Sequence, residues 1–182
     1  MKIFICGVSR SGKTHLASLL SEELNAPYFS ASGWLHELDP VRAKIAEGEG
    51  KQQYIDRLTA MSLEALQDDP NICIDYCLGK MRINRVTPTI IEGLRNPRDF
   101  LSLYNPTQDV VIWLTNEQVG DTPATSFENI GLEAIMSYIE FQRLIHQDLK
   151  FVRVTHTGPP DGLEQELDSI LSTIGATKRW RL

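Results

Sequence analysis

The residues best suited to chemistry stand near the amino terminus, in the segment GVSRSGKT at positions 7–14. This segment matches the pattern G-x-x-x-x-G-K-[ST] at every position. Its glycines let the backbone turn so that successive N–H groups point at phosphate oxygens, and a following helix directs its positive dipole end at the same anion. Lys13 supplies a mobile positive charge for the β and γ phosphates. The sequence therefore predicts a site for ATP and Mg²⁺, with the Thr14 hydroxyl as metal ligand. The predicted cofactor-binding residues are Gly7, Val8, Ser9, Arg10, Ser11, Gly12, Lys13 and Thr14.

Several classes of nucleotide-binding protein use such a loop, and other segments separate them. A GTPase carries an N-K-x-D segment after a strand to read its base. Residues 115–118 (TNEQ) occupy the corresponding place here, without the lysine or the aspartate. A signature of ABC-type ATPases is also missing from the sequence. Small-metabolite kinases and nucleotide-binding regulators remain.

A second group of reactive side chains follows the apolar run at positions 89–91, in the segment EGLRNPRD. At the carboxyl end of a parallel strand such side chains face the ligand crevice. Glu92 can orient a metal-bound water there, and Arg95 can grip a phosphate through two parallel hydrogen bonds, with Arg98 assisting. We therefore predict Lys13, Glu92 and Arg95 as catalytic residues. In the alternative interpretation Arg95 pairs with a surface carboxylate such as Asp99, four residues further along a short helix.

Strand and helix signals alternate along the whole chain. Short apolar runs typical of buried parallel strands cover residues 2–8, 27–30, 87–92, 109–114 and 151–155. Helical periodicity covers residues 14–24, 34–68 with a break at the glycines of 47–50, 72–83, 97–103, 127–150 and 162–174. This alternation predicts an α/β fold: a doubly wound, mostly parallel five-stranded sheet with helices on both faces.

Composition narrows the possible partners. A net charge of −6 argues against nucleic acid as a partner, and with it against a polynucleotide kinase. No apolar run reaches the roughly 20 residues that span a bilayer, and the apolar start of the chain is interpreted as a strand rather than a signal peptide. The basic cluster at 177–181 is interpreted as a solvated terminus. The chain has three cysteines, at positions 6, 73 and 77, and their number and spacing do not indicate a disulfide framework. We therefore predict that the cysteines pack in the core and that the protein is cytoplasmic.

The order of these segments resembles that of the nucleoside monophosphate kinases. In that family the phosphate-binding loop is followed, after a short second strand, by a small hydroxyl residue and a glycine; here these are Ser32 and Gly33. The segment IIEGLR at 90–95 is similar to the strand-acid-glycine-x-(Pro)-arginine segment of adenylate kinase, deoxynucleoside monophosphate kinase and dephospho-CoA kinase relatives. The resemblance implies one kinase-like domain over 1–182, with an acceptor-binding helical insert at about 33–70 and a short lid at about 115–126. The implied acceptor-binding residues are Ser32, Gly33, Trp34, Arg95 and Arg98.

Two segments depart from that family. After the Ser-Gly pair, adenylate kinases continue with an aspartate and, three residues later, an arginine for the acceptor phosphate; this chain has a tryptophan and a glutamate. Their lid carries arginines that neutralise the transferring group, whereas residues 115–128 contain no arginine or lysine. Arg10, Arg143 and Lys150 are the basic residues that could substitute for them.

These observations predict a kinase that transfers a phosphoryl group from ATP to a small metabolite, above all a nucleoside or deoxynucleoside monophosphate. One alternative is a hydroxyl acceptor of the dephospho-CoA kind, for which Glu37 and Asp39 are the candidate bases. Another is a nucleotide-binding regulatory module with little or no turnover, which the arginine-free lid favours. The acceptor's identity and the oligomeric state stay open at this point.

Overall fold

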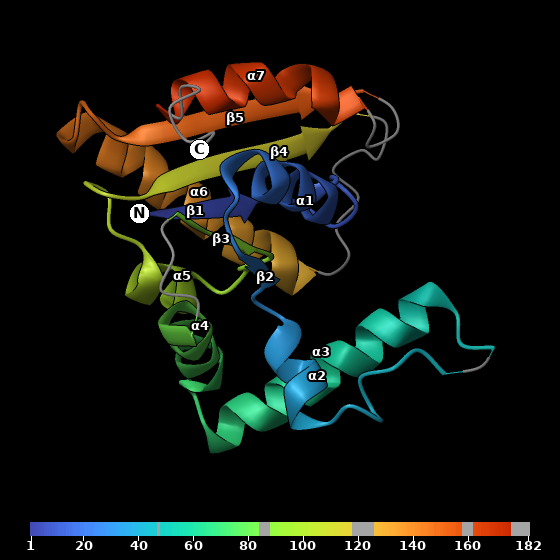
Figure 1. The fold of residues 1–182 in the computed structure, drawn as a ribbon. Coiled ribbons are helices and arrows are strands. Elements are labelled where there is room, and N and C mark those ends of the chain that lie inside the picture. Colours follow the sequence, from blue (N-terminus) through green and yellow to red (C-terminus); the bar gives the residue numbers. More distant parts are fainter. Residues whose placement is uncertain (47, 84–87, 118–125, 158–161, 176–182) are drawn as a thin grey trace.

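A five-stranded sheet forms the centre of the computed structural model (Figure 1). The structure describes residues 1–46, 48–83, 88–117, 126–157 and 162–175. The strands are β1 (Lys2–Cys6), β2 (Tyr28–Ser30), β3 (Thr89–Glu92), β4 (Val110–Asn116) and β5 (Lys150–His156). They lie in the order β2-β3-β1-β4-β5, and every pairing is parallel. The predicted five-stranded α/β fold is confirmed, and the sheet described here is parallel throughout.

Helices cover both faces of this sheet (Figure 1). They are α1 (Lys13–Leu24), α2 (Gly33–Leu38), α3 (Lys51–Asp68), α4 (Ile72–Ile83), α5 (Pro97–Leu103), α6 (Ser126–Ile145) and α7 (Leu163–Thr173). Helices α1 and α7 pack against one face, and α5 and α6 against the other. Helices α2 and α3 extend away from the sheet below β2, where α2 also packs against α4 (Figure 1). None of the helices in the described ranges is long and apolar enough to cross a membrane.

The alternation of side chains along β1 builds a core on each face. Ile3 and Ile5 point into the α1–α7 layer, while Phe4 and Cys6 point into the layer of α5 and α6. All three cysteines are free and buried, and Cys73 shares a core-facing side of α4 with Cys77, which confirms their predicted core packing. Burial raises the pKa of the Cys6 thiol to about 12, so this cysteine is a packing residue.

Two predicted helices are shorter than expected. The helix expected from residue 34 to the predicted break at 47–50 is short: α2 ends at Leu38, whereas α3 begins at Lys51, directly after that break. Pro40 disfavours helical geometry at the preceding residue, and Asp39 instead accepts hydrogen bonds from the N–H groups of Val41 and Arg42. The helix expected over 127–150 ends at Ile145. A turn then leads into β5, which starts at Lys150 rather than at residue 151.

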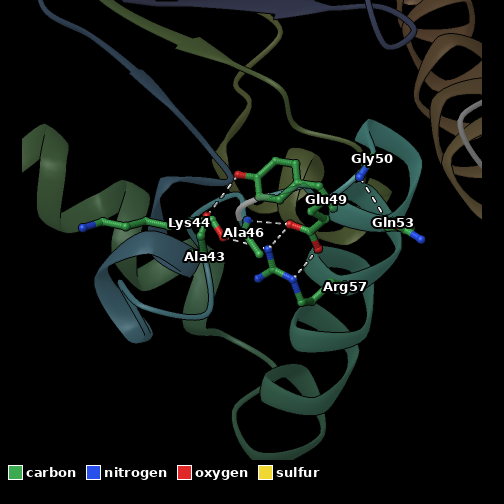
Figure 2. Close-up of polar contacts among 8 residues, drawn as sticks. Ala43, Lys44, Ala46, Glu49, Gly50, Gln53 and Arg57 are labelled. Carbon is green, nitrogen blue, oxygen red and sulfur yellow. Dashed lines mark hydrogen bonds and ion pairs between the residues drawn. The ribbon is translucent and has the colours of Figure 1, made fainter.

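Side chains of α3, above all Arg57, hold the segment between α2 and α3 in place (Figure 2). The Arg57 guanidinium donates to both carboxylate oxygens of Glu49, at 2.9 and 2.7 Å, and to the Lys44 carbonyl at 2.7 Å. Glu49 also accepts the Ala46 N–H at 2.9 Å. These hydrogen bonds lower the pKa of Glu49 to about 2. The irregular segment is therefore fastened to α3 by a charged contact.

Candidate functional site

The GVSRSGKT loop connects β1 to α1 at the carboxyl edge of the sheet. The strand order places β3 beside β1, on the side away from β4. The connection that leaves β1 leads to β2 at one edge of the sheet, whereas the connection that leaves β3 leads to β4 on the other side of β1. The point between β1 and β3 is therefore a topological switch point. Ligands bind at such switch points in open α/β sheets. Ile5 is in register with Glu92, which brings the loop after β1 next to the EGLR segment after β3. The topology thus joins the two groups of residues that the sequence singled out.

The backbone of the loop needs glycine at its start. Gly7 has a φ of 144°, and a Cβ there would collide with the carbonyl oxygen of Leu114. Arg10 adopts a left-handed conformation, with a φ of 68°, that is uncommon for a residue with a side chain. Its side chain is exposed at the tip of the loop. Backbone strain of this kind costs of order 1–3 kcal/mol and clusters at ligand-binding sites.

The start of α1 offers groups that fit phosphate and Mg²⁺. Gly12 precedes this helix and has no side chain that could cap it, and the N–H groups at the start of a helix are a favourable binding site for an anion. Lys13 is only 7% exposed, and its Nζ donates to the Val8 carbonyl at 2.6 Å. The Thr14 hydroxyl donates to Oε1 of Glu92 at 3.5 Å, and Glu92 is 6% exposed. This pair of oxygen ligands is of the kind that Mg²⁺ prefers.

A cavity of about 270 Å³ opens beside the loop, and we name it the acceptor cavity. Ser9 of the loop forms part of its wall, and the Arg95 guanidinium, which also lines it, donates to the Ser9 hydroxyl at 3.2 Å. The other walls come from the β2–α2 connection, α2, α3, α4 and the segment from β3 into α5. The remaining lining residues are Ala31, Ser32, Trp34, Leu35, Ile55, Leu58, Thr59, Ser62, Leu63, Leu66, Cys73, Gly93, Leu94, Asn96 and Asp99.

The implied acceptor-binding residues lie in three different environments. Ser32, Trp34 and Arg95 line the acceptor cavity together. Gly33 starts α2 at a point where the Tyr76 hydroxyl occupies the space that a Cβ would need. Arg98 is outside the cavity lining: its guanidinium donates to the Pro70 carbonyl at 2.9 Å and to the Asn71 side chain at 2.6 Å. The described contacts of Arg98 thus connect α5 to the start of α4.

Two of the three expected substitutes for lid arginines lie at the wrong end of the sheet. Lys150 opens β5 in register with Val110, at the amino edge, whereas the loop follows the carboxyl end of β1. Arg143 stacks over the ring of Phe151 at 5.3 Å, next to that same edge. The expectation that either could serve the loop is wrong, because strand direction separates them from it. Arg10 remains within the loop itself. Most of the expected lid, residues 118–125, and the basic cluster at 177–181 lie outside the described residues.

The alternative interpretation of Arg95 takes Asp99 as a surface carboxylate, whereas the structure buries Asp99 beside the acceptor cavity. It is 4% exposed, so its interpretation as a surface carboxylate is wrong. Burial raises the pKa of the carboxyl, while hydrogen bonding with Cys73 and the positive charge of Arg98 lower it. Its Oδ1 has no hydrogen-bond partner among the described residues. The sequence held only a weak signal, a carboxylate one helical turn after a predicted ligand-binding arginine.

The sequence also gave no indication of a role for His156, which lies behind the loop. It ends β5, is buried, and its Nε2 lies 2.9 Å from the Ser11 carbonyl oxygen. Because a carbonyl only accepts, Nε2 carries the hydrogen and donates it. His156 therefore ties the end of β5 to the middle of the loop. A polar residue at the carboxyl end of a predicted parallel strand was the available signal.

Comparisons with known proteins give matches among solved structures only. No protein-family model matches the chain. No curated protein matches it either. It is similar to a shikimate kinase from Aquifex aeolicus, with 19% identity, 97% of each chain covered and a TM-score of 0.48. It is also similar to a sugar kinase from a Janibacter species, with 15% identity and a TM-score of 0.46; the match covers 98% of this chain and 96% of the sugar kinase. A dephospho-CoA kinase from Campylobacter jejuni matches with 15% identity and a TM-score of 0.46, and the match covers 97% of this chain and 100% of that kinase.

Proposed function

We propose that this protein transfers the γ-phosphoryl group of ATP to a small metabolite, and that the acceptor is a nucleoside or deoxynucleoside monophosphate. The observation that carries the proposal is the position of Ser9. This residue belongs to the phosphate-binding loop and also forms a wall of the acceptor cavity, where Arg95 donates to it. A donor site and an acceptor cavity that share a wall can bring two phosphate groups together, which is the main requirement of phosphoryl transfer.

The loop residues account for holding the donor. The N–H groups at the start of α1 would bind phosphate oxygens, and Lys13 would set its charge beside the β and γ phosphates. Thr14 and Glu92 would hold Mg²⁺, Thr14 as a ligand and Glu92 through a bound water. When bound, ATP supplies the phosphoryl group and Mg²⁺ offsets its negative charge. Arg10, exposed at the tip of the loop, would add positive charge on the side facing solvent.

The acceptor side favours a phosphate over a hydroxyl. A phosphate acceptor is ionised at neutral pH and needs no base, whereas a hydroxyl acceptor needs a carboxylate within reach. The two candidate bases are engaged elsewhere: Glu37 pairs with Lys80 at 2.5 Å, and Asp39 caps the turn that follows α2. Arg95 lines the cavity with a planar guanidinium, a group that matches the geometry of phosphate.

The test is acceptor-dependent formation of ADP. Wild-type protein with ATP and Mg²⁺ is assayed with no acceptor and with a panel of nucleoside monophosphates, sugars and shikimate. We expect turnover with nucleoside monophosphates, and a loss of about 10²–10³-fold in Lys13→Ala. Lys80→Ala is the matched control, since Lys80 pairs with Glu37 away from the loop. ATP binding without turnover on any acceptor would identify a regulatory module instead.

A further inference from the structure

Gly131 lies inside α6, at a position where neither helix propensity nor backbone geometry requires a glycine. A glycine in the interior of a helix destabilises that helix relative to alanine. The glycines that the structure describes with a positive φ do not include Gly131, so alanine could adopt its conformation. What remains as a reason for the glycine is a close contact with a neighbouring segment.

That contact is with the backbone of Arg95. A Cβ added at Gly131 would collide with the Arg95 carbonyl oxygen and would stand 3.6 Å from Cδ of Pro97. A backbone oxygen cannot swing aside as the end of a flexible side chain can. The missing side chain of Gly131 therefore lets α6 pack directly against the segment that carries Arg95.

Helix α6 is the less movable of these two partners. Leu132 and Ile135 of α6 are 3% and 1% exposed, and they share a core cluster with Phe100 of α5. Retreat of the helix would open that core, and a close-packed interior has no free space for an added methyl group. Residues 93–96, by contrast, belong to no helix or strand. A side chain in place of the glycine would therefore displace the segment that carries Arg95.

The same segment sets the position of a guanidinium at the acceptor cavity. The backbone of Arg95 rests on α6, while its side chain lines the cavity and donates to Ser9 of the phosphate-binding loop at 3.2 Å. A displacement of about 1 Å can slow an enzymatic reaction by about 10²-fold, even when its cause lies far from the chemistry.

Resting on the proposed function, we propose that Gly131 is a positioning residue for phosphoryl transfer. It does not touch the acceptor. By its lack of a side chain it seats the backbone of Arg95 against α6, and this contact fixes where the Arg95 guanidinium stands relative to the loop.

Alanine substitution at two helix glycines tests this inference. In the part of the chain that the structure describes, a Cβ at Gly79 of α4 meets nothing within 4 Å apart from its chain neighbours and its own helix. With the acceptor that ADP formation identifies, we expect Gly131→Ala to lower kcat/KM for the acceptor about 10²-fold and to leave the KM for ATP unchanged. Gly79→Ala is the matched control and should keep wild-type kinetics with a raised melting temperature.

A double-mutant cycle shows whether the effect of Gly131 acts through Arg95. In an Arg95→Ala background, Gly131→Ala should cause no further loss of acceptor use, since the guanidinium that it displaces is already gone. A further loss as large as that in the single variant would mark a general disturbance of the fold and would overturn the inference. Wild-type acceptor kinetics in the single variant Gly131→Ala would overturn it as well.

NMR of the wild type keeps the inference testable if Gly131→Ala does not fold. The ¹⁵N-labelled protein is titrated with the acceptor in the absence of ATP, and the indole N–H of Trp34, which lines the cavity, reports binding. The amide signal of Gly131 should then shift, and that of Gly79 should not. A Trp34 signal that moves while Gly131 stays unchanged overturns the inference and leaves the proposed function intact. Absence of ADP formation with every acceptor is a different result: it overturns the proposed function, and this inference with it.

Discussion

Replacing Arg95 with alanine removes the cation that connects the acceptor cavity to the phosphate-binding loop. The side chain is exposed and donates a 3.2 Å hydrogen bond to Ser9, and because substitutions at exposed positions usually change stability little, the fold should lose little. The loss in acceptor use is much larger, because hydrogen bonds to a charged phosphate contribute about 1.5–3 kcal/mol. That free energy corresponds to a decrease of about 10- to 150-fold in kcat/KM for the acceptor.

Steady-state kinetics with the acceptor varied at saturating ATP, and then the reverse, would measure this effect. We expect the KM for ATP to change little in Arg95→Ala, and Arg95→Lys to recover only part of the loss, since an ammonium lacks the planar fork. Arg98→Ala is the matched control, because that arginine binds Pro70 and Asn71 and does not line the cavity. Acceptor kinetics that stay unchanged in Arg95→Ala, or that fall equally in Arg98→Ala, would refute the assignment.

Two further predictions concern the parts of the fold that hold the site. Arg57 lowers the pKa of Glu49 from 4.5 to about 2, so the contribution of this pair to stability is present above pH 4.5 and is lost as the pH falls towards 2. The melting temperatures of the wild type and of Glu49→Gln, measured against pH, should therefore converge over that range, and a constant difference between them would contradict the pairing. His156→Leu should leave the buried Ser11 carbonyl without its donor, which should lower the free energy of unfolding by about 1–3 kcal/mol and weaken ATP binding. His156→Gln keeps an N–H and should retain part of the stability and of the ATP affinity; chemical denaturation and ATP titration measure the two effects, and two variants that behave alike would argue against the hydrogen bond.

The parts of the fold that were predicted correctly depend on local signals. Helix α5 begins at Pro97 because Asn96 accepts the N–H of Arg98, a cap that three adjacent residues specify. The loop from Gly7 and the buried run of β4 were equally clear, since each needs a particular residue pattern over a few positions. Alternation of such elements was enough to predict a parallel sheet.

The parts that were missed depend on contacts between distant segments. The irregular segment after α2 is fixed by Arg57 of α3, and the burial of Asp99 depends on α4 packing against α5. The direction of β5 places Lys150 far from the loop, which its position in the sequence does not reveal. His156 reaches Ser11 across 145 residues of chain. A single sequence carries no record of these pairings.

Phosphorus NMR of wild-type protein with ATP, Mg²⁺ and one nucleoside monophosphate at a time would test the central claim most directly, because it identifies the product rather than the loss of ATP. We expect the γ-phosphate signal of ATP to decline while the two phosphate signals of a nucleoside diphosphate of the added base appear, and we expect Lys13→Ala to slow both changes about 10²–10³-fold. Release of inorganic phosphate alone, or an unchanged spectrum with every nucleotide tested, would contradict phosphoryl transfer between the loop and the acceptor cavity.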